Sequence, residues 1–290
     1  MALERDPKSG YLTTGHEWNG LTELNTPVPR LVFFVLIVAF LFSIGYWVLM
    51  PAWPVGTTYT KGLLGTDQRD VVSEALQQAA VDRASWTDQV ARESFGQIQA
   101  DPKLMAAVRQ TGRTLFGDDC AVCHGRDARG GKGFPNLTSG AWLWGGSPEA
   151  IAETIRVGIN SAHSNSRNSQ MPAFGRDQVL QRAEIENVVA YVLTLSEPSV
   201  KPVAGNAEAG KAVFAANCAV CHGPDAKGKS DVGAPDLTDK LWLHGSDEAT
   251  LYMDVWGGLQ GHMPTWEDRL SPVQRKILAL YLVDLRTARP

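Results

Sequence analysis

The sequence predicts a mainly α-helical protein in which one transmembrane helix precedes two small domains of the same fold. Three observations support this: an uncharged apolar stretch near the N-terminus, a long repeat in the C-terminal part, and helical spacing of apolar residues in both copies. A chain of 290 residues is long enough for about two domain cores. Its 27 basic and 31 acidic residues give a net charge of −4, which argues against a nucleic-acid-binding protein.

The apolar stretch at residues 31–50 reads LVFFVLIVAFLFSIGYWVLM and contains no charge. As a helix it spans about 30 Å, which matches the hydrocarbon core of a bilayer. Aromatic residues typical of a membrane interface gather at its C-terminal end: Tyr46, Trp47 and Trp53. A cleaved signal peptide is the alternative, but a long polar segment precedes the stretch and a Pro-rich segment follows it in place of a cleavage site. We therefore expect a single transmembrane helix.

The segments on either side of this helix carry weaker signals. Residues 1–30 are expected to form an N-terminal tail. Residues 51–103 are expected to form a partly helical connector, because apolar residues recur at helical spacing after the N-cap candidates Thr66 and Asp67. A small helical domain of its own is the alternative for this connector.

The repeat predicts two domains, at residues 104–198 and 204–288. Its most conspicuous part is the pentapeptide Cys-Ala-Val-Cys-His, which occupies 120–124 and again 218–222 and contains every cysteine of the chain. Each copy is expected to consist of a helix that enters the pentapeptide, a Gly-rich loop, short helices, a Met-Pro turn and a closing amphipathic helix.

The C-x-x-C-H pattern is the one at which haem is covalently attached, because two thiols add to the vinyl groups and the next histidine reaches the iron. We therefore expect two covalently bound haem c groups. The predicted attachment residues are Cys120, Cys123, Cys218 and Cys221, and the predicted proximal iron ligands are His124 and His222.

Other uses of the cysteines fit the spacing less well. A Cys₄ zinc site would not need a histidine after each pair, and the pairs lie about 95 residues apart, well beyond the roughly 15 to 20 residues of a zinc ribbon. A thioredoxin-like redox pair would need a βαβ pattern, which surrounds neither motif. Disulfides that close such tight loops are rarer still.

The distal iron ligands are predicted to be Met171 and Met263, because both occupy equivalent repeat positions and both are followed by proline. Core packing is the alternative role for a methionine. Which methionine serves which haem stays open, since two touching domains could exchange ligands. His262 is the alternative to Met263. His163 lies in the Ser/Asn-rich stretch 161–169, which is expected to be an exposed loop, and His244 and His16 are expected at the surface.

The order of elements resembles that of the small class I c-type cytochrome domain. The resemblance implies that a proline carbonyl in the loop after each motif accepts the N–H of the proximal histidine, and Pro135 and Pro235 match that position. Trp142 and Trp242 could donate their indole N–H to a haem propionate. A purely packing role for these two tryptophans stays open.

The whole chain resembles the CcoP (FixP) subunits of cbb3-type cytochrome c oxidases. The segment from Glu23 to Arg30, with Asn25, Pro27 and Pro29, is similar to the acidic N-x-P-x-P-R approach to the membrane in that family. Tyr46 and Pro51 match a second pattern near the end of the span. The chain departs from the family at three positions near the membrane, which bear on subunit contacts: Leu31, Val32 and Met50.

This resemblance implies an electron-transfer role in aerobic or microaerobic respiration. The subunit would accept single electrons from a c-type cytochrome donor and pass them, through a monohaem cytochrome c subunit, toward the haem–copper catalytic subunit that reduces oxygen. The chain itself would carry no oxygen chemistry, although it belongs to a proton-translocating oxidoreductase complex. Because haem c is attached outside the bacterial cytoplasm, we expect an inner-membrane protein with a cytoplasmic N-terminus and periplasmic haem domains.

Three other functions are weighed against this one. Another membrane-anchored dihaem carrier, such as the cytochrome subunit of a periplasmic dehydrogenase, is the first alternative. A dihaem peroxidase would need one iron that opens to peroxide, whereas both repeats offer a methionine, and a haem-based gas sensor would need a signalling domain. Residues 204–290 carry nine basic and eleven acidic residues against ten and nine in residues 104–203, which favours a basic electron donor at the second domain.

Overall fold

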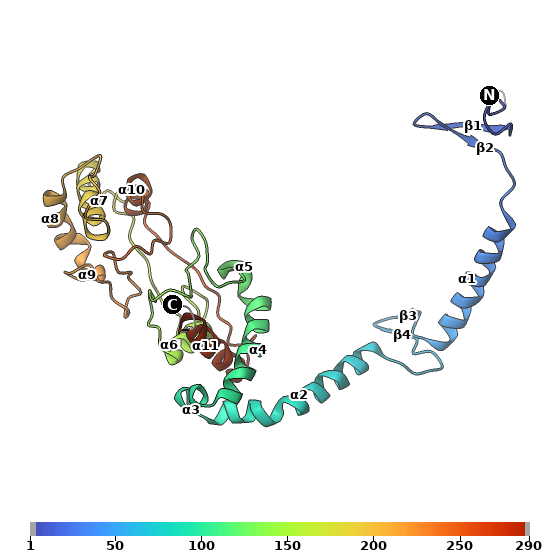
Figure 1. The fold of residues 1–290 in the computed structure, drawn as a ribbon, viewed down its shortest axis with the longest axis horizontal. Coiled ribbons are helices and arrows are strands. Elements are labelled where there is room, and N and C mark those ends of the chain that lie inside the picture. Colours follow the sequence, from blue (N-terminus) through green and yellow to red (C-terminus); the bar gives the residue numbers. More distant parts are fainter. Residues whose placement is uncertain (1–3, 288–290) are drawn as a thin grey trace. The chain divides into compact units, whose positions relative to one another are not determined.

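The computed structural model describes residues 4–287, and helices are the main regular structure in it (Figure 1). The chain divides between Asp82 and Arg83 into two compact units. The first unit contains two β-hairpins and the long apolar helix. The second unit contains all four cysteines. Helix α2 (Gln68–Arg92) begins in the first unit and ends in the second.

Helix α1 (Arg30–Leu49) coincides with the span predicted at residues 31–50. Its mean hydropathy reaches 2.6, and none of its side chains is buried inside the protein. Within residues 4–287 it is the one helix that is long and apolar enough to cross a membrane. An α-helix satisfies its own backbone hydrogen bonds, so a bilayer can surround this apolar surface without leaving polar groups unpaired.

The N-terminal tail, for which the sequence predicts no regular structure, contains a β-hairpin. Strands β1 (Thr13–Trp18) and β2 (Leu21–Leu24) pair antiparallel. Asn19 and Gly20 between them have positive φ angles of 51° and 87°, as a two-residue type I′ turn requires. A second antiparallel pair, β3 (Pro54–Val55) and β4 (Thr58–Tyr59), follows α1.

Several helices of the second unit begin at capping residues. Asp101, Asn206 and Asp247 each accept backbone N–H groups at an N-cap, and Pro102 and Pro148 stand in the first turns of their helices. The helices in chain order are α3 (Phe95–Ala100), α4 (Pro102–Asp119), α5 (Ala121–His124), α6 (Pro148–Val157), α7 (Arg182–Ser196), α8 (Ala207–Asn217), α9 (Ala219–His222), α10 (Glu248–Gly257) and α11 (Pro272–Thr287).

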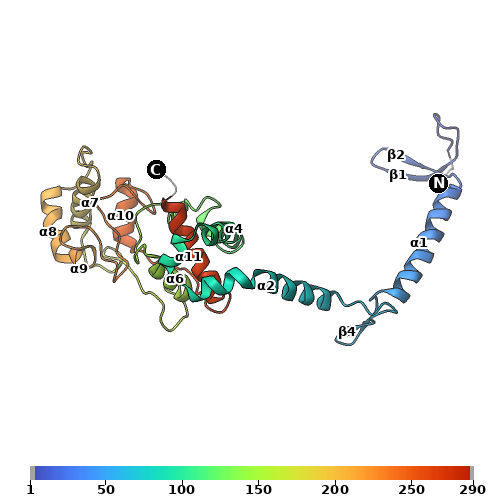
Figure 2. The same ribbon diagram turned by 60° about the horizontal axis from the view of Figure 1, so that its bottom comes forward.

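The closing helix of each repeat packs on the opening helix of the other repeat. Helix α11 packs on α4 and α6, whereas α7 packs on α8 and α10. Figure 1 and Figure 2 show this grouping from two directions. We call the first group lobe A (residues 102–158 and 263–287, with α4, α5, α6 and α11) and the second group lobe B (residues 171–257, with α7, α8, α9 and α10).

Glycines permit the close approach of the paired helices in both lobes. A Cβ at Gly112 of α4 would lie 2.6 Å from the Cβ of Tyr281 on α11, and a Cβ at Gly210 of α8 would lie 1.9 Å from the carbonyl oxygen of Asn187 on α7. An aromatic pair stands beside each crossing, with ring centroids 6.0 Å apart for Phe116 and Tyr281 and 5.4 Å apart for Tyr191 and Phe214. The aromatic residues at equivalent positions of the two repeats therefore pair between repeats. Phe116 of the first repeat pairs with Tyr281 of the second, and Tyr191 of the first repeat pairs with Phe214 of the second.

The chain crosses between the lobes at two short antiparallel bridges. Ile159 and Met263 exchange two backbone hydrogen bonds of 2.9 Å, and Met171 and Leu259 exchange bonds of 2.9 and 3.1 Å. After its bridge, each segment docks on a helix of the opposite repeat. Trp266, for example, donates its backbone N–H to Ile155 on α6 over 3.1 Å.

The domain boundaries predicted from the repeat, 104–198 and 204–288, therefore differ from the lobes in the structure. Each lobe combines the first part of one repeat with the last part of the other. The sequence pattern could not reveal this exchange, because both closing helices carry an aromatic residue and apolar residues at the same repeat positions. Either closing helix thus fits either opening helix by pattern alone.

Candidate haem sites

Each pentapeptide forms a helical turn directly after the opening helix of a lobe. Cys120 ends α4 and begins α5: its N–H donates to the Phe116 carbonyl over 2.9 Å, and its carbonyl accepts from the His124 N–H over 3.0 Å. Cys218 makes the equivalent bonds, of 2.8 and 2.9 Å, between α8 and α9. Residues three or four apart share a helix face, so each turn brings two thiols and a histidine to one place.

A proline carbonyl orients each of these histidines. His124 Nδ1 lies 3.3 Å from the Pro135 carbonyl oxygen, and His222 Nδ1 lies 3.0 Å from the Pro235 carbonyl oxygen. When Nδ1–H is the donor, Nε2 keeps its lone pair for a metal ion. Burial lowers the pKa of both imidazoles, which favours the neutral form that can bind iron.

A glycine in each loop allows the proline carbonyl to approach the histidine. Gly130 has a φ of +69°, and a Cβ there would lie 2.2 Å from the Phe134 oxygen and 2.6 Å from the Pro135 oxygen. Gly228 has a φ of +77°, and its Cβ would lie 2.4 Å from the Ala234 oxygen. Both the left-handed backbone and the lack of space require glycine.

The thiol of the first cysteine in each motif lies in an environment that disfavours its charged form. Burial raises the pKa of the Cys120 thiol to about 12 and that of the Cys218 thiol to about 11. Neither is therefore a reactive thiolate at neutral pH. No disulfide joins the four cysteines, which belong to two lobes.

The two methionines predicted as distal ligands lie at the crossings between the lobes. Met263, although it belongs to the second repeat, packs against the core of lobe A, which includes Phe116 and Leu278. Met171 leads into a segment that docks on α10 of lobe B, where Phe174 N–H donates to the Val255 carbonyl over 3.1 Å. Each methionine therefore lies beside the lobe that holds the other repeat's pentapeptide.

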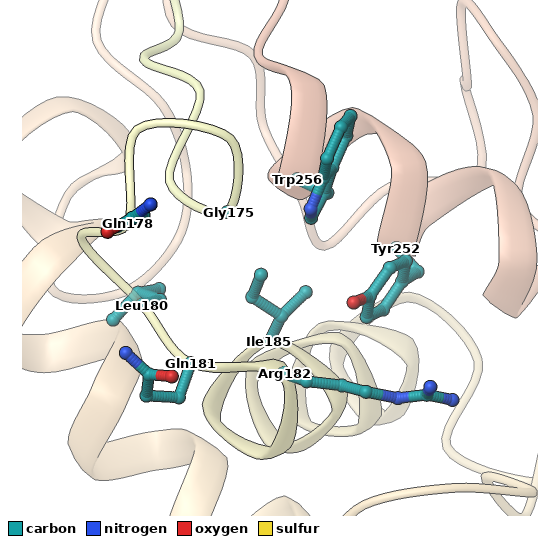
Figure 3. Close-up of a pocket in the computed structure, with 8 residues that line it drawn as sticks. All are labelled: Gly175, Gln178, Leu180, Gln181, Arg182, Ile185, Tyr252 and Trp256. Carbon is teal, nitrogen blue, oxygen red and sulfur yellow. The ribbon is translucent and has the colours of Figure 1, made fainter.

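Figure 3 shows how the segment after Met171 fits into lobe B. Trp256 and Tyr252 of α10 lie opposite Gly175 and Ile185 around a small pocket. A Cβ at Gly175 would lie 2.1 Å from Cδ1 of Trp256. The indole thus occupies the space that a larger residue at 175 would need, and this contact fixes the segment to α10.

His163 differs from the prediction of an exposed loop residue. Its side chain is only 12% exposed, and its Nε2 lies 2.7 Å from Glu267 Oε2. Glu267 also accepts a hydrogen bond of 2.8 Å from Arg156 on α6. Part of the Ser/Asn-rich loop is half-buried, and its polar groups bond one another there, as when Ser166 Oγ accepts the Ser161 N–H over 2.8 Å.

The indole N–H groups of two tryptophans bear on whether a haem group fits these sites. Trp242 Nε1 is buried and has no acceptor within residues 4–287, whereas Trp142 Nε1 donates to the Ser139 carbonyl over 3.0 Å. A haem propionate is an acceptor of the kind that Trp242 lacks. The thiols, the oriented imidazoles and this unpaired donor therefore fit a haem group attached at each pentapeptide.

Three family models match successive parts of the chain. The model described as the N-terminal domain of cytochrome oxidase-cbb3, FixP, matches residues 10–57. The cytochrome c model matches residues 110–196, and the model for cytochrome C oxidase, cbb3-type, subunit III, matches residues 205–282. Two cytochrome c domains therefore follow the N-terminal segment, as the sequence predicted.

Named relatives are similar over almost their whole length. The cbb3-type cytochrome c oxidase subunit FixP of Bradyrhizobium sp. (strain ORS 278) is 46% identical over 282 residues, which cover 97% of each chain. FixP of Bradyrhizobium diazoefficiens is 44% identical over 283 residues, with 97% of each chain covered. The subunit CcoP of Azospirillum brasilense is 41% identical over 289 residues, again with 97% of each chain covered.

These similarities confirm the predicted family, the predicted fold class and the predicted cofactors. The chain is anchored to a membrane through α1 and serves in electron transfer. Two cytochrome c domains in such a subunit carry two covalently bound haem c groups. The chain belongs to the FixP/CcoP family of cbb3-type cytochrome c oxidase subunits.

Proposed function

We propose that the two cysteines of each pentapeptide attach one haem and that the exchanged lobes supply its axial ligands. The haem of the first motif would have His124 and Met263 as ligands, and the haem of the second motif would have His222 and Met171. The packing of Met263 against the core of lobe A supports the first pair. The docking of the segment after Met171 on α10 supports the second.

Each bound haem supplies one reversible one-electron step between ferric and ferrous iron. A methionine ligand raises the reduction potential relative to a second histidine, which suits a carrier near the oxidising end of respiration. We propose that the chain accepts electrons from a c-type cytochrome on the periplasmic side of the inner membrane. It passes them through a monohaem subunit toward the haem–copper centre of the oxidase.

The proposal that electrons enter at lobe B rests on the difference in charge between the two lobes. Lobe B has seven basic and twelve acidic residues, whereas lobe A has eleven basic and eight acidic residues. The exchange of closing helices thus produces a larger asymmetry than the contiguous repeats have. A basic donor cytochrome would be steered to lobe B, so the haem of the second motif would be reduced first.

Exposure at the motifs supports electron exchange at the surface of each lobe. Val122 and Val220, which stand between the two cysteines of their motifs, are 93% and 72% exposed. Apolar side chains at such positions can be covered by a partner at a haem edge without loss of core packing. Lobe B could therefore receive a donor while lobe A faces the next carrier.

The proposal is tested by the rate at which a basic donor cytochrome reduces the detergent-solubilised oxidase complex. Asp231→Lys in lobe B is expected to slow this reduction and to flatten its dependence on ionic strength, since attraction between exposed charges is screened by salt. Asp118→Lys in lobe A makes the same charge change at an exposed site and should have little effect. Equal effects of the two variants, or rates that do not fall with salt in the unaltered complex, would contradict entry at lobe B.

The proposed partners require a separate experiment. Purification in mild detergent should recover the chain together with a haem–copper subunit and a monohaem cytochrome c. Recovery with a periplasmic dehydrogenase and no haem–copper subunit would contradict the proposed place in the oxidase.

A further inference from the structure

Two buried nitrogen donors lie together without a partner in the described protein. Trp144 Nε1 and Arg167 Nε are both inaccessible to solvent, and neither has a hydrogen-bond acceptor within residues 4–287. The guanidinium carbon of Arg167 lies 5.1 Å from the centroid of the Trp144 ring. Arg167 also forms no ion pair with a carboxylate within 4.0 Å among these residues.

These donors lie at the junction of the two lobes. Arg167 Nη2 donates to the Ala150 carbonyl of α6 in lobe A over 3.2 Å. A Cβ at Gly233, in the loop of lobe B just before Pro235, would lie 2.4 Å from the Trp144 ring. Ser169 Oγ donates to the Gly233 carbonyl over 3.4 Å. The two side chains thus contact lobe A on one side and the loop beside the second motif on the other.

A buried guanidinium N–H without an acceptor and a buried indole N–H without an acceptor are both costly arrangements. A water molecule would satisfy a donor but not the charge. A carboxylate would satisfy both nitrogen atoms and the charge at once. Each haem c group carries two propionate carboxylates, and two such groups belong to this protein.

We propose that Trp144 and Arg167 form a clamp for a haem propionate at the junction of the lobes. The indole N–H and the guanidinium Nε–H each donate to the carboxylate. The positive charge of Arg167 and the two N–H donors stabilise the ferrous haem, which carries one positive charge less than the ferric haem. The clamp therefore raises the reduction potential of that haem. Both residues act as positioning residues for the haem and take no part in oxygen chemistry.

The clamp makes two otherwise equivalent haem sites different. The position equivalent to Trp144 in the second repeat is His244, and the Ser/Asn-rich stretch that contains Arg167 has no counterpart there. The protein therefore has one clamp for two haem groups that share the same motif and the same predicted ligand types. We infer that this difference separates the two potentials and so helps to set the direction of electron transfer between the haems.

The test measures the midpoint potentials of both haems in the full chain within the oxidase complex. Arg167→Gln is expected to shift the reduction equilibrium of one haem toward the ferric state by about tenfold, because the positive charge that is lost stabilises the ferrous state more than the ferric state. Trp144→Phe keeps an aromatic ring at this position and removes the indole N–H, so it should shift the same haem in the same direction by less. Arg113→Gln, at an exposed position on α4, removes an equal charge and should leave both potentials unchanged.

A second readout distinguishes a propionate contact from a general effect of charge. The propionate bending bands of the resonance Raman spectrum should move in Arg167→Gln and in Trp144→Phe, and Arg167→Lys should restore the potential in part because the charge remains. A shift confined to the first-motif haem assigns the propionate to lobe A, and a shift confined to the second-motif haem assigns it to lobe B. Unchanged bands and potentials in both variants, or equal shifts in Arg113→Gln, would overturn the proposal.

Discussion

Met171 and Met263 occupy equivalent places in the repeat, yet each lies beside the lobe of the other repeat's pentapeptide. The histidines differ in this respect, because His124 and His222 are held by proline carbonyls from their own repeats. At the scale of single residues, the proximal side of each haem site is therefore local in sequence. The distal side depends on a residue far along the chain.

Single replacements of the methionines test the exchanged ligands. Met263→Ala is expected to lower the potential of the first-motif haem by on the order of 0.1 V, part of the roughly 0.8 V range that axial ligands set. Met171→Ala should do the same to the second-motif haem. In each variant, nuclear Overhauser contacts between the remaining iron-bound methionine methyl and the thioether bridges identify the haem that kept its ligand. The pairing is wrong if Met263→Ala leaves the first-motif haem with its methionine.

At the scale of elements, each lobe depends on one close crossing of an opening helix and a closing helix. Gly112 provides the space in lobe A and Gly210 provides it in lobe B. The crossing in lobe A is reinforced by a bidentate pair in which Arg109 donates to Asp284 over 2.7 and 2.8 Å. This pair is partly exposed, so its contribution to stability is small. Burial of the apolar helix faces contributes most of the association.

Glycine replacements in α4 test which closing helix it contacts. Gly112→Ala places a methyl group against Tyr281 and is expected to reduce the free energy of unfolding by about 1–3 kcal/mol, as overpacking typically does. Gly117→Ala, in the same helix with nothing within 4 Å, should be neutral or stabilise by up to about 1 kcal/mol.

A double-mutant cycle tests the same contact, with the free energy of unfolding measured by chemical denaturation. Gly112→Ala should couple to Tyr281→Ala and add independently to Tyr191→Ala, because residues in contact are not additive. Coupling to Tyr191 in place of Tyr281 would show that α7, and not α11, closes lobe A.

At the scale of the whole second unit, two chain crossings join the lobes. Neither lobe can be completed without a segment that first passes through the junction at Ile159 and Leu259. The same exchange gathers acidic residues in lobe B and leaves lobe A basic. The exchange of segments therefore underlies both the stability of the two lobes and the difference in net charge between them.

We expect residues 83–287 to unfold in a single cooperative transition. Denaturation followed by the methionine–iron absorption band and by far-ultraviolet circular dichroism should give coincident curves, because disruption of one lobe releases a segment that the other requires. Gly112→Ala should then shift the transitions of both haem groups together. Two separate transitions, with only the first-motif haem affected by Gly112→Ala, would contradict the interwoven arrangement.

Much of this protein is predictable because its signals are local. Haem attachment follows from five adjacent residues, the membrane helix follows from a continuous apolar stretch, and Gly130 and Gly228 mark loops whose backbone only glycine can adopt. The N-terminal hairpin was missed although Asn19 and Gly20 are a strong turn signal, since the strands around them are short and mostly exposed. The half-buried position of His163 does not follow from composition, because composition alone does not show which polar groups a loop can satisfy internally.

The sequence by itself determined two haem attachment motifs, a membrane span and a repeated helical domain with a nominated methionine in each copy. Only the tertiary structure decided which halves combine, which lobe each methionine lies beside, and where Trp144 and Arg167 meet. The physical reason is that a repeat duplicates every contact surface. When two closing helices offer the same apolar face and aromatic residue, local pattern assigns them equally well to either partner, and the connections between them select the arrangement.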